Sequence, residues 1–370
     1  MTIYLDYQAT TPLAPEARAA MLPWLGSDDG FGNPHSPHKM GRAAAAAVEV
    51  AREAVAELLP AGGHVYFTSG ATEALNWAIK GAWRGQSGRA NIVVPDSEHA
   101  AVRDTALWTQ ERGHDVTIIP VGADGLVDFT TVQQAVSPQT TLIAAMHVNN
   151  EIGVIQPIAA LAELAHANGA LMLCDAVQSY GRIAIPDGPD LIAISAHKIH
   201  GPKGIGALWV RDGVALEPLL HGGGQEGGVR SGTLSPALCA GFGAAAALAK
   251  ARSEADGDHV AYLWDEAQQN IPKNWTINGS ITDRYKGNLN IYMKNIDASR
   301  LISDVRGVAF SAGSACASGS GRSSHVLRAL GLSEAEARSS IRLGFGRYTT
   351  SNDLRTALEM IITAAKSQEI

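Results

Sequence analysis

Short apolar runs alternate with stretches of helical length from residue 65 onward. The apolar runs lie at residues 65–68, 91–94, 116–119, 141–146, 169–174, 190–194 and 204–210. Buried parallel strands read as continuous apolar runs, because helices cover both faces of their sheet. The pattern therefore predicts an α/β fold in which a mostly parallel sheet lies between two layers of helices.

The pattern changes near residue 252. Beyond this point the strand-like runs no longer alternate regularly with helices, and they lie at residues 287–292, 308–311 and 340–345, followed by a helical stretch at 351–366. A chain of 370 residues is long enough for two domains. We therefore expect a large domain formed by residues 14–252 and a smaller α+β domain formed by residues 1–13 and 253–370.

Composition argues against several classes of protein. The chain has 29 Lys and Arg against 36 Asp and Glu, which gives a net charge of −7. Binding to nucleic acid needs clustered cations that neutralise phosphates, so no nucleic-acid partner is expected. The first residues lack the pattern of a signal peptide, and no apolar stretch is long enough to span a bilayer. We expect a cytoplasmic protein without a membrane partner.

An aspartate and a lysine follow two of the apolar runs. Asp175 ends the run at residues 169–174, and Lys198 comes shortly after the run at residues 190–194. A pyridoxal-phosphate site requires such a pair, because the lysine forms an imine with the cofactor aldehyde and the acid keeps the ring nitrogen protonated. The protonated ring can then accept electrons. The pair predicts a pyridoxal-phosphate enzyme.

A strand-to-helix junction and two histidines could complete this site. The sequence Thr68-Ser-Gly-Ala-Thr-Glu73 offers free N–H groups and the Thr72 hydroxyl to a phosphate, although the same residues also form ordinary helix caps. His99 opens a helix, either as a structural cap or as an acid/base group stacked on the cofactor. His197, next to the lysine, is placed to contact the phosphate.

Other chemistries lack a required partner in the sequence. His197 and His200 have no suitably spaced cysteine or carboxylate, so no metal site is predicted. The His-Gly-Gly-Gly run at residues 221–224 is similar to the oxyanion loop of lipase-like hydrolases, but no Gly-x-Ser-x-Gly pentapeptide accompanies it. A Gly-x-x-x-x-Gly-Lys-[Ser/Thr] phosphate loop does not occur either.

Cys316 differs from the other two cysteines. Its surroundings at residues 311–324 consist mainly of Gly, Ser and Ala, so we expect the thiol on an exposed loop where its reactivity decides its use. Cys174 and Cys239 lie in apolar or Ala-rich stretches and are expected to be buried. Arg342 is either a bidentate clamp for a substrate carboxylate or a partner in a surface salt bridge.

In this order, the motifs resemble those of the group I cysteine desulfurases (NifS/IscS-like) of the class V aminotransferase family. The resemblance extends over nearly the whole chain, with matching motifs at residues 4–12, 32–34, 68–73, 146–153, 175–178, 195–204, 221–224, 230–233, 311–318, 326–331 and 340–342. It implies a fold-type I homodimer with pyridoxal 5'-phosphate at the subunit interface. The implied reaction converts L-cysteine to L-alanine and moves the sulfur to the protein.

The resemblance also implies a role for each site residue. Lys198 would form the imine, Asp175 would pair with the pyridine nitrogen, and Gln178 would bond the ring hydroxyl. His99 would stack on the ring and handle protons, and Cys316 would attack the substrate sulfur and become a persulfide. The phosphate would be held by Ala71, Thr72, Ser195, His197 and, from the neighbouring subunit, Thr233. The substrate would be oriented by Asn33, Asn150 and Arg342, with Asn150 also contacting the cofactor.

Departures from the family pattern leave the sulfur acceptor open. Close relatives have Arg where this chain has Gly227, and the Arg-rich stretch of bacterial housekeeping members reads Arg211-Asp-Gly-Val-Ala-Leu-Glu-Pro here. The expected acceptor is a scaffold protein or a sulfurtransferase that serves iron–sulfur cluster assembly or thiolation. Alternative interpretations are a selenocysteine lyase, another class V lyase or aminotransferase, and a cofactor-binding scaffold without catalysis. The complete set of predicted catalytic residues disfavours the scaffold.

Overall fold

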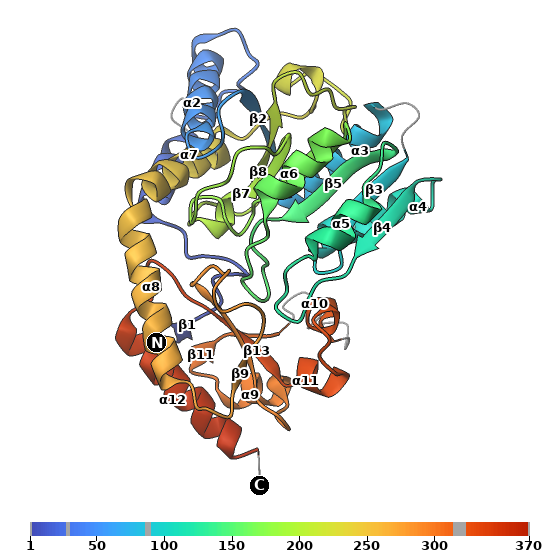
Figure 1. The fold of residues 1–370 in the computed structure, drawn as a ribbon. Helices are drawn as coiled ribbons and strands as arrows, with labels where there is room; N and C mark the ends of the chain where they lie inside the picture. The colour runs from blue at the N-terminus through green and yellow to red at the C-terminus, as the bar shows by residue number, and fades with distance from the viewer. Residues whose placement is uncertain (1, 27–29, 86–89, 314–322, 369–370) are drawn as a thin grey trace.

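A seven-stranded sheet forms the centre of the upper part of the molecule, and a four-stranded sheet lies in its lower part (Figure 1). The structure is a computed structural model that describes residues 2–26, 30–85, 90–313 and 323–368. Helices cover the larger sheet, which confirms the α/β fold expected from the alternation of apolar runs and helical stretches. The proposed division into two domains, with a boundary at residues 252 and 253, stays a prediction.

The larger sheet is mostly parallel. Its strands, in spatial order, are β2 (Gly63–Thr68), β8 (Gly206–Arg211), β7 (Leu191–Ser195), β6 (Leu171–Asp175), β5 (Thr140–Met146), β3 (Asn91–Pro95) and β4 (Asp115–Ile119). Only the pairs that include β8 are antiparallel. As β8 reverses direction between β2 and β7, these two strands end at the same edge as the parallel strands.

Side chains that alternate along each strand divide the interior into two cores. In β5, Ile143 and Ala145 belong to one core, and Leu142 and Ala144 belong to the other. The helices of the first core are α1 (Pro15–Met21), α2 (Lys39–Ala56), α5 (Phe129–Ala135), α6 (Ile158–Ala167) and α7 (Pro236–Ala251). The second core is covered by α3 (Ala71–Gly85) and α4 (Ala100–Gln110). Both faces of the sheet are therefore buried.

A third core lies between the smaller sheet and the C-terminal helices. The sheet has the order β12 (Ser311–Ala312), β13 (Ser340–Gly344), β10 (Asn288–Tyr292) and β9 (Thr276–Ile277), beside a parallel pair formed by β1 (Ile3–Tyr4) and β11 (Val308–Ala309). The helices of this core are α8 (Ser253–Asn270), α9 (Ala298–Asp304) and α12 (Ser351–Lys366). Leu5 also belongs to it, so the two ends of the sequence share one core.

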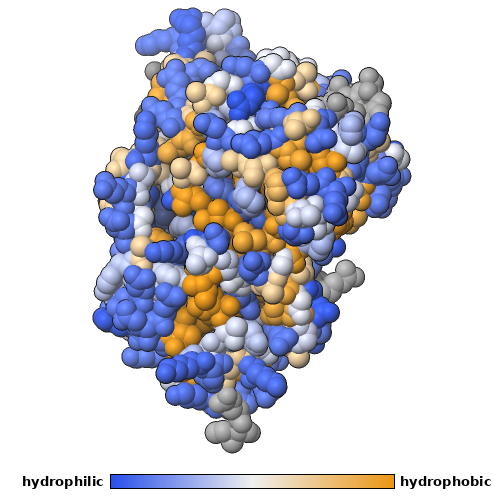
Figure 2. Space-filling model, viewed as in Figure 1, coloured by the Kyte–Doolittle hydropathy of each residue, from blue (hydrophilic) through white to orange (hydrophobic). Residues whose placement is uncertain are grey.

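Two short helices connect this region to the larger one. They are α10 (His325–Ala329) and α11 (Glu334–Arg338), and their buried residues Val326, Leu327 and Ala337 belong to the first core. On the face shown in Figure 2, polar residues cover the outlying helices, and apolar residues gather nearer the middle of the molecule. The packing of α10 against the first core brings Ser324 and His325 into contact with Glu151 and Glu98, respectively.

Some elements differ from the sequence-based expectation. Helix α1 ends at Met21, and the chain continues as a 3-10 turn, Leu22–Trp24, in which Pro23 cannot supply a helical N–H. Helix α8 was not predicted from the sequence. Its sequence is polar and contains Gly257, and it is held in place by buried residues such as Leu263 and Trp264 in the third core.

Candidate active site

A cavity of about 480 Å³ lies at the carboxyl-terminal edge of the larger sheet. Ligand cavities commonly occupy this edge of a parallel sheet, where the strands end and loops begin. Of the residues predicted for the site, the cavity brings together Ala71, Thr72, His99, Asn150, Asp175, Gln178, Ser195, His197, Lys198 and Arg342. These residues span 271 positions of sequence (342 − 71), and the fold collects them around one volume.

The register of the strands explains why these residues meet. Met146 is paired with Asp175 across β5 and β6, and Asp175 is paired with Ala193 across β6 and β7. Ser195 and Thr68 are both paired with Gly206 of β8, from opposite sides. The ends of β5 and β6 are therefore level, those of β2 and β7 lie two residues further along, and the residues that follow all four strands reach the same cavity.

Lys198 projects from the turn that follows β7 and contacts the N-terminal segment. Its ammonium donates hydrogen bonds to the carbonyl oxygens of Gln8 and Ala9, the latter at 2.9 Å. The Gln178 side chain donates to the same Gln8 carbonyl at 3.0 Å and accepts a hydrogen bond from Arg182 at 2.7 Å. The backbone at residues 8 and 9 thus forms a polar wall of the cavity, a role that sequence reasoning did not assign.

Asp175 is buried, with 5 % of its surface exposed, and its Oδ1 accepts the N–H of Val177 at 3.0 Å. Burial raises the pKa of this carboxyl group, while the nearby His99 and Lys198 oppose the increase. A carboxylate in such surroundings gains strongly from a cationic partner. A protonated ring nitrogen that enters the cavity would be such a partner.

His99 performs the cap role and also lines the cavity. Its Nδ1 accepts the N–H of Ala101 at 3.1 Å and thereby caps α4. Burial lowers the pKa of His99, so the ring is neutral near pH 7, and an accepting Nδ1 places the remaining proton on Nε2. The cap role and the position in the cavity are therefore compatible, because the cap bond fixes a ring that also lines the cavity.

The junction between β2 and α3 provides the anion-binding part of the cavity. Ser69, Gly70, Ala71 and Thr72 line it at the N-terminus of a helix of 15 residues, where free N–H groups and the helix dipole favour an anion. The junction packs closely on β8, since a Cβ at Gly206 would lie only 2.8 Å from the Gly70 backbone. A side chain at position 206 would therefore displace the junction.

Cations and a neutral histidine face this junction. Lys203, which was not predicted as a site residue, lines the cavity together with His197. Burial and the charges of Lys198, Lys203 and Arg182 lower the pKa of His197 to about 4, so its ring is neutral near pH 7. Its Nδ1 lies 3.1 Å from the Thr10 hydroxyl. Lys203 belongs to the motif at residues 195–204, which was a signal that could have identified it.

Arg342 also lines the cavity and is buried, with 1 % of its surface exposed. One terminal nitrogen donates to the carbonyl oxygen of Asn150 at 2.9 Å, and the other donates to Asp6 Oδ1 at 2.9 Å. The surface salt bridge considered from the sequence is therefore wrong, because the Arg342 side chain is buried and only Asp6 is partly exposed. Among the described residues, Arg342 Nε and Asn150 Oδ1 are buried without a hydrogen-bond partner.

Two predicted residues lie outside this cavity. Asn33 and Thr233 are exposed, and the Asn33 side chain accepts the N–H of His35 at 2.9 Å. Cys316 lies outside the described residues. The run at residues 221–224 is exposed and does not line the cavity, and Glu226 anchors the segment through two hydrogen bonds of 2.8 Å from Arg52.

The chemistry of the cavity fits pyridoxal phosphate. It offers an amine for the aldehyde, a buried carboxylate for the ring nitrogen, a neutral imidazole, and a helix N-terminus with a lysine for the phosphate. Its volume falls within the roughly 300–1,000 Å³ typical of cofactor sites. No group of three His, Cys, Asp or Glu side chains suited to a metal ion occurs in the described part of the chain.

Comparison with known protein families shows to which family this chain belongs. A family model described as aminotransferase class-V matches residues 3–356. The chain belongs to the class-V aminotransferase family. This result confirms the resemblance found in the sequence, and with it the predicted cofactor, because the family uses pyridoxal phosphate.

Relatives of this class-V aminotransferase chain are cysteine desulfurases. It is 42 % identical to "Cysteine desulfurase IscS" of Rickettsia africae, over 98 % of this chain and 90 % of the relative. It is 43 % identical to "Probable cysteine desulfurase, mitochondrial" of Dictyostelium discoideum, over 97 % of this chain and 82 % of the relative. The assignment to the cysteine desulfurases is thereby confirmed.

Solved structures show the same fold. A NifS-like protein has a TM-score of 0.91 at 30 % identity, with 99 % of this chain and 100 % of that chain covered. SspA in complex with cysteine has a TM-score of 0.83 at 35 % identity, with 94 % and 100 % covered. Within the described residues of the class-V chain, no helix has the length and apolar character needed to traverse a membrane.

A buried histidine near the site should make the protein sensitive to acid. Burial lowers the pKa of His147 to about 4, whereas an unfolded histidine titrates near pH 6.5. Between these values the unfolded chain binds a proton that the folded protein does not, so stability falls as the pH falls. The contribution of His147 amounts to about 2 kcal/mol between pH 7.5 and pH 5.

We therefore expect His147→Gln to lose about 2 kcal/mol less stability than the wild type over this pH interval. Urea denaturation at both pH values measures the difference. His35→Gln is the control, since His35 is exposed, and its pH dependence should match that of the wild type. An identical pH dependence of the wild type and His147→Gln would contradict the prediction.

Proposed function

We propose that this protein uses pyridoxal phosphate to convert L-cysteine to L-alanine and transfers the sulfur to Cys316 as a persulfide. One observation carries the proposal. Lys198, Asp175, His99 and Arg342 surround a single cavity in a chain whose relatives are cysteine desulfurases. An imine-forming amine, an acid, a proton carrier and a carboxylate-binding cation are the groups that this reaction requires.

Residues of the cavity would hold the cofactor at three points. Lys198 would bind its aldehyde carbon, and Asp175 would bind its ring nitrogen. Its phosphate would lie at the N-terminus of α3 against Thr72, with Ser195 and His197 nearby. When bound, the cofactor supplies an electron sink for the bonds at the substrate α-carbon. Gln178, which faces the same volume, would bond the ring hydroxyl.

Arg342 would bind the substrate carboxylate. Its Nε is buried and unpartnered among the described residues, and Asp6 and Asn150 hold its two terminal nitrogens in fixed positions. A guanidinium held in this way is oriented before the substrate arrives, which reduces the entropy lost on binding. The unpartnered Asn150 Oδ1 is available to accept a hydrogen bond from the substrate or the cofactor.

His99 would move protons. Its lowered pKa keeps it neutral near pH 7 with its proton on Nε2, so it can give that proton to the reacting group and take one back at the same atom. The cap bond to Ala101 holds the ring in place during both transfers. Cys316 would form an S–S bond with the substrate sulfur while the Cβ–S bond breaks. The β-carbon keeps the electron pair of the broken bond and takes up a proton, which yields the methyl group of alanine.

A homodimer belongs to the proposal. Asn33 and Thr233 are exposed and outside the cavity of their own chain, where they could serve a cavity of a second copy. Leu25 and Phe31, near Asn33 in sequence, expose 65 % and 69 % of their surfaces, and a subunit contact would bury this apolar area. A sulfur-acceptor protein and a location in the cytoplasm stay predictions from the sequence.

One incubation tests the proposed function. Purified protein loaded with pyridoxal phosphate is mixed with L-cysteine, and alanine is measured together with the mass of the peptide that contains Cys316. We expect alanine and a mass increase of one sulfur atom on this peptide before any thiol is added. Alanine without modified Cys316 would reject the persulfide route, and no alanine would reject the desulfurase itself. A parallel incubation with L-selenocysteine measures the substrate preference.

A further inference from the structure

Two serines flank residues 314–322, and each donates a hydrogen bond to a carboxylate. Ser311 in β12 donates from its Oγ to Asp6 Oδ1 at 2.8 Å. Ser324, directly before α10, donates from its Oγ to Glu151 Oε2. No local sequence pattern predicts either contact, because the partners are 305 and 173 positions apart.

Both carboxylates belong to the part of the structure that would bind the substrate. Asp6, which is partly exposed, forms the ion pair with the buried Arg342, at 2.9 Å. Glu151 follows Asn150 directly, exposes 4 % of its surface, and is fixed at its N–H by Asn149 Oδ1 at 2.9 Å. The serines therefore join the two ends of the segment to the groups around the substrate carboxylate.

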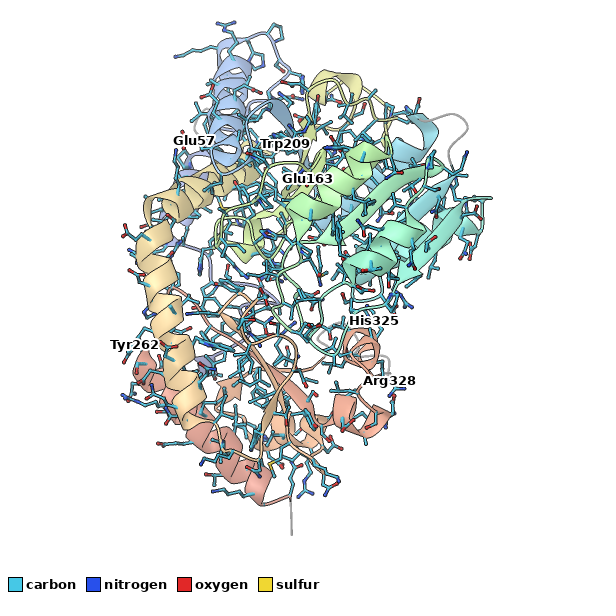
Figure 3. The ribbon with its side chains drawn as sticks, in the orientation of Figure 1. Glu57, Glu163, Trp209, Tyr262, His325 and Arg328 are labelled. Atoms are coloured by element: carbon cyan, nitrogen blue, oxygen red, sulfur yellow. The ribbon has the colours of Figure 1, made fainter. Side chains whose placement is uncertain are left out.

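His325, which follows Ser324, adds a second contact on the C-terminal side of residues 314–322. Its Nε2 lies 2.8 Å from the carbonyl oxygen of Glu98, the residue before His99. Glu98 is fully buried, and its Oε1 accepts the N–H of Met146 at the end of β5. Figure 3 shows His325 on the side of α10 that faces the larger sheet. Ser324 and His325 thus contact the segments that carry Asn150 and His99, respectively.

The buried Glu151 carboxyl group depends on the hydrogen bond from Ser324. A buried carboxyl group that loses its hydrogen-bond donor is destabilised, because nothing then offsets the free energy of its desolvation. Burial raises the pKa of Glu151 to about 7, and Ser324 opposes this increase. The Ser324 hydroxyl also accepts the N–H of Leu327 at 3.0 Å and caps α10. One hydroxyl therefore holds the start of α10 both to its own helix and to the cavity wall.

We propose that Ser311 and Ser324 are positioning residues for sulfur transfer, because they fix both ends of the Cys316 segment to the substrate-binding wall. The inference rests on the proposed function. Fixing the ends of a chain segment limits the volume that its side chains can reach, which raises the effective concentration of the thiol at the substrate. The serines touch neither the substrate nor Cys316 in this role.

The test compares Ser324→Ala and Ser311→Ala with Ser323→Ala. Ser323 is the matched control, since it is the neighbouring serine and donates to a carboxylate as well, but to Glu334 of α11, outside the cavity. Rapid mixing of holoenzyme with L-cysteine gives the rate of persulfide formation on Cys316. The change in visible absorption with L-cysteine concentration gives the apparent dissociation constant of the substrate.

We expect persulfide formation to slow by about 10-fold in Ser324→Ala, with a substrate dissociation constant within about 2-fold of the wild type. Ser311→Ala should slow the same step, and it should also weaken substrate binding, because Ser311 lies 3.4 Å from an Arg342 nitrogen. Ser323→Ala should match the wild type in both measurements. Ser324→Thr, which keeps the hydroxyl, should restore most of the rate.

Equal rates of persulfide formation in Ser324→Ala and Ser323→Ala would overturn the inference. An increase in the dissociation constant with no change in the rate would also overturn it, since the serines would then act on binding alone. If loss of the α10 cap prevents Ser324→Ala from folding, Ser311→Ala decides, because Ser311 caps no helix. Alanine formation without any persulfide in the wild type rejects the proposed function instead, so the two failures are distinguishable.

Discussion

Lys198→Ala should abolish the visible absorption of the bound cofactor and reduce alanine formation by at least ~10⁴-fold. The expected effect is large because among the described residues only Lys198 and Lys203 bring an amine to the cavity, and only Lys198 projects from the end of β7 beside Asp175. Of its present acceptors, the Gln8 carbonyl oxygen keeps the hydrogen bond from Gln178, and both Gln8 and Ala9 line the cavity.

The measurement is an absorption spectrum after reconstitution and gel filtration, followed by an assay for alanine. Lys250→Ala is the control, because this exposed lysine pairs with Glu57 on the surface at 3.2 Å. Its spectrum and turnover should equal those of the wild type. An unchanged visible spectrum in Lys198→Ala would show that another group holds the aldehyde, and the assignment of this cavity would have to be withdrawn.

Cys316→Ala should reduce alanine formation from L-cysteine by at least ~10³-fold while the visible absorption of the cofactor stays unchanged. The substrate sulfur leaves only when a nucleophile takes it, and in our proposal this nucleophile is the Cys316 thiolate. The variant should still respond to L-cysteine with a spectral change, since Arg342 and Lys198 are intact. Binding would thereby be separated from sulfur transfer.

Cys239→Ala provides the control for the loss of a thiol. Cys239 is fully buried in α7, and burial raises the pKa of its thiol to about 12, so it does not form a thiolate near neutral pH. Its replacement should leave alanine formation within about 2-fold of the wild type. Sustained desulfurase turnover in Cys316→Ala would refute the persulfide mechanism and favour another class V lyase or an aminotransferase.

Much of the larger sheet could be predicted from the sequence, because its strands are buried on both faces and appear as separate apolar runs. The run at residues 204–210 gave the position of β8 but not its direction, since direction depends on which neighbours it joins. Helix α8 was missed for a related reason. Its polar sequence has little periodic signal, and it is stabilised by packing against α12 in the third core.

In the candidate site, too, some residues could be predicted from the sequence and others could not. Lys198 and Asp175 could be placed from the runs that precede them, and the junction at residues 68–73 from its glycine and hydroxyl residues. The wall formed by Gln8 and Ala9 and the ion pair between Asp6 and Arg342 could not be predicted. No local pattern marks them, because their partners are between 189 and 336 positions away.

The sequence by itself determined the α/β architecture, the predicted cofactor and the family, because apolar periodicity and short motifs are local properties that survive without coordinates. The tertiary structure decided that Arg342 is buried and that His99 is both a cap and a cavity residue, and it showed that Ser311 and Ser324 contact the carboxylates of Asp6 and Glu151. Burial and long-range hydrogen bonds depend on how distant segments pack, and this packing sets the charge state and orientation on which the chemistry depends.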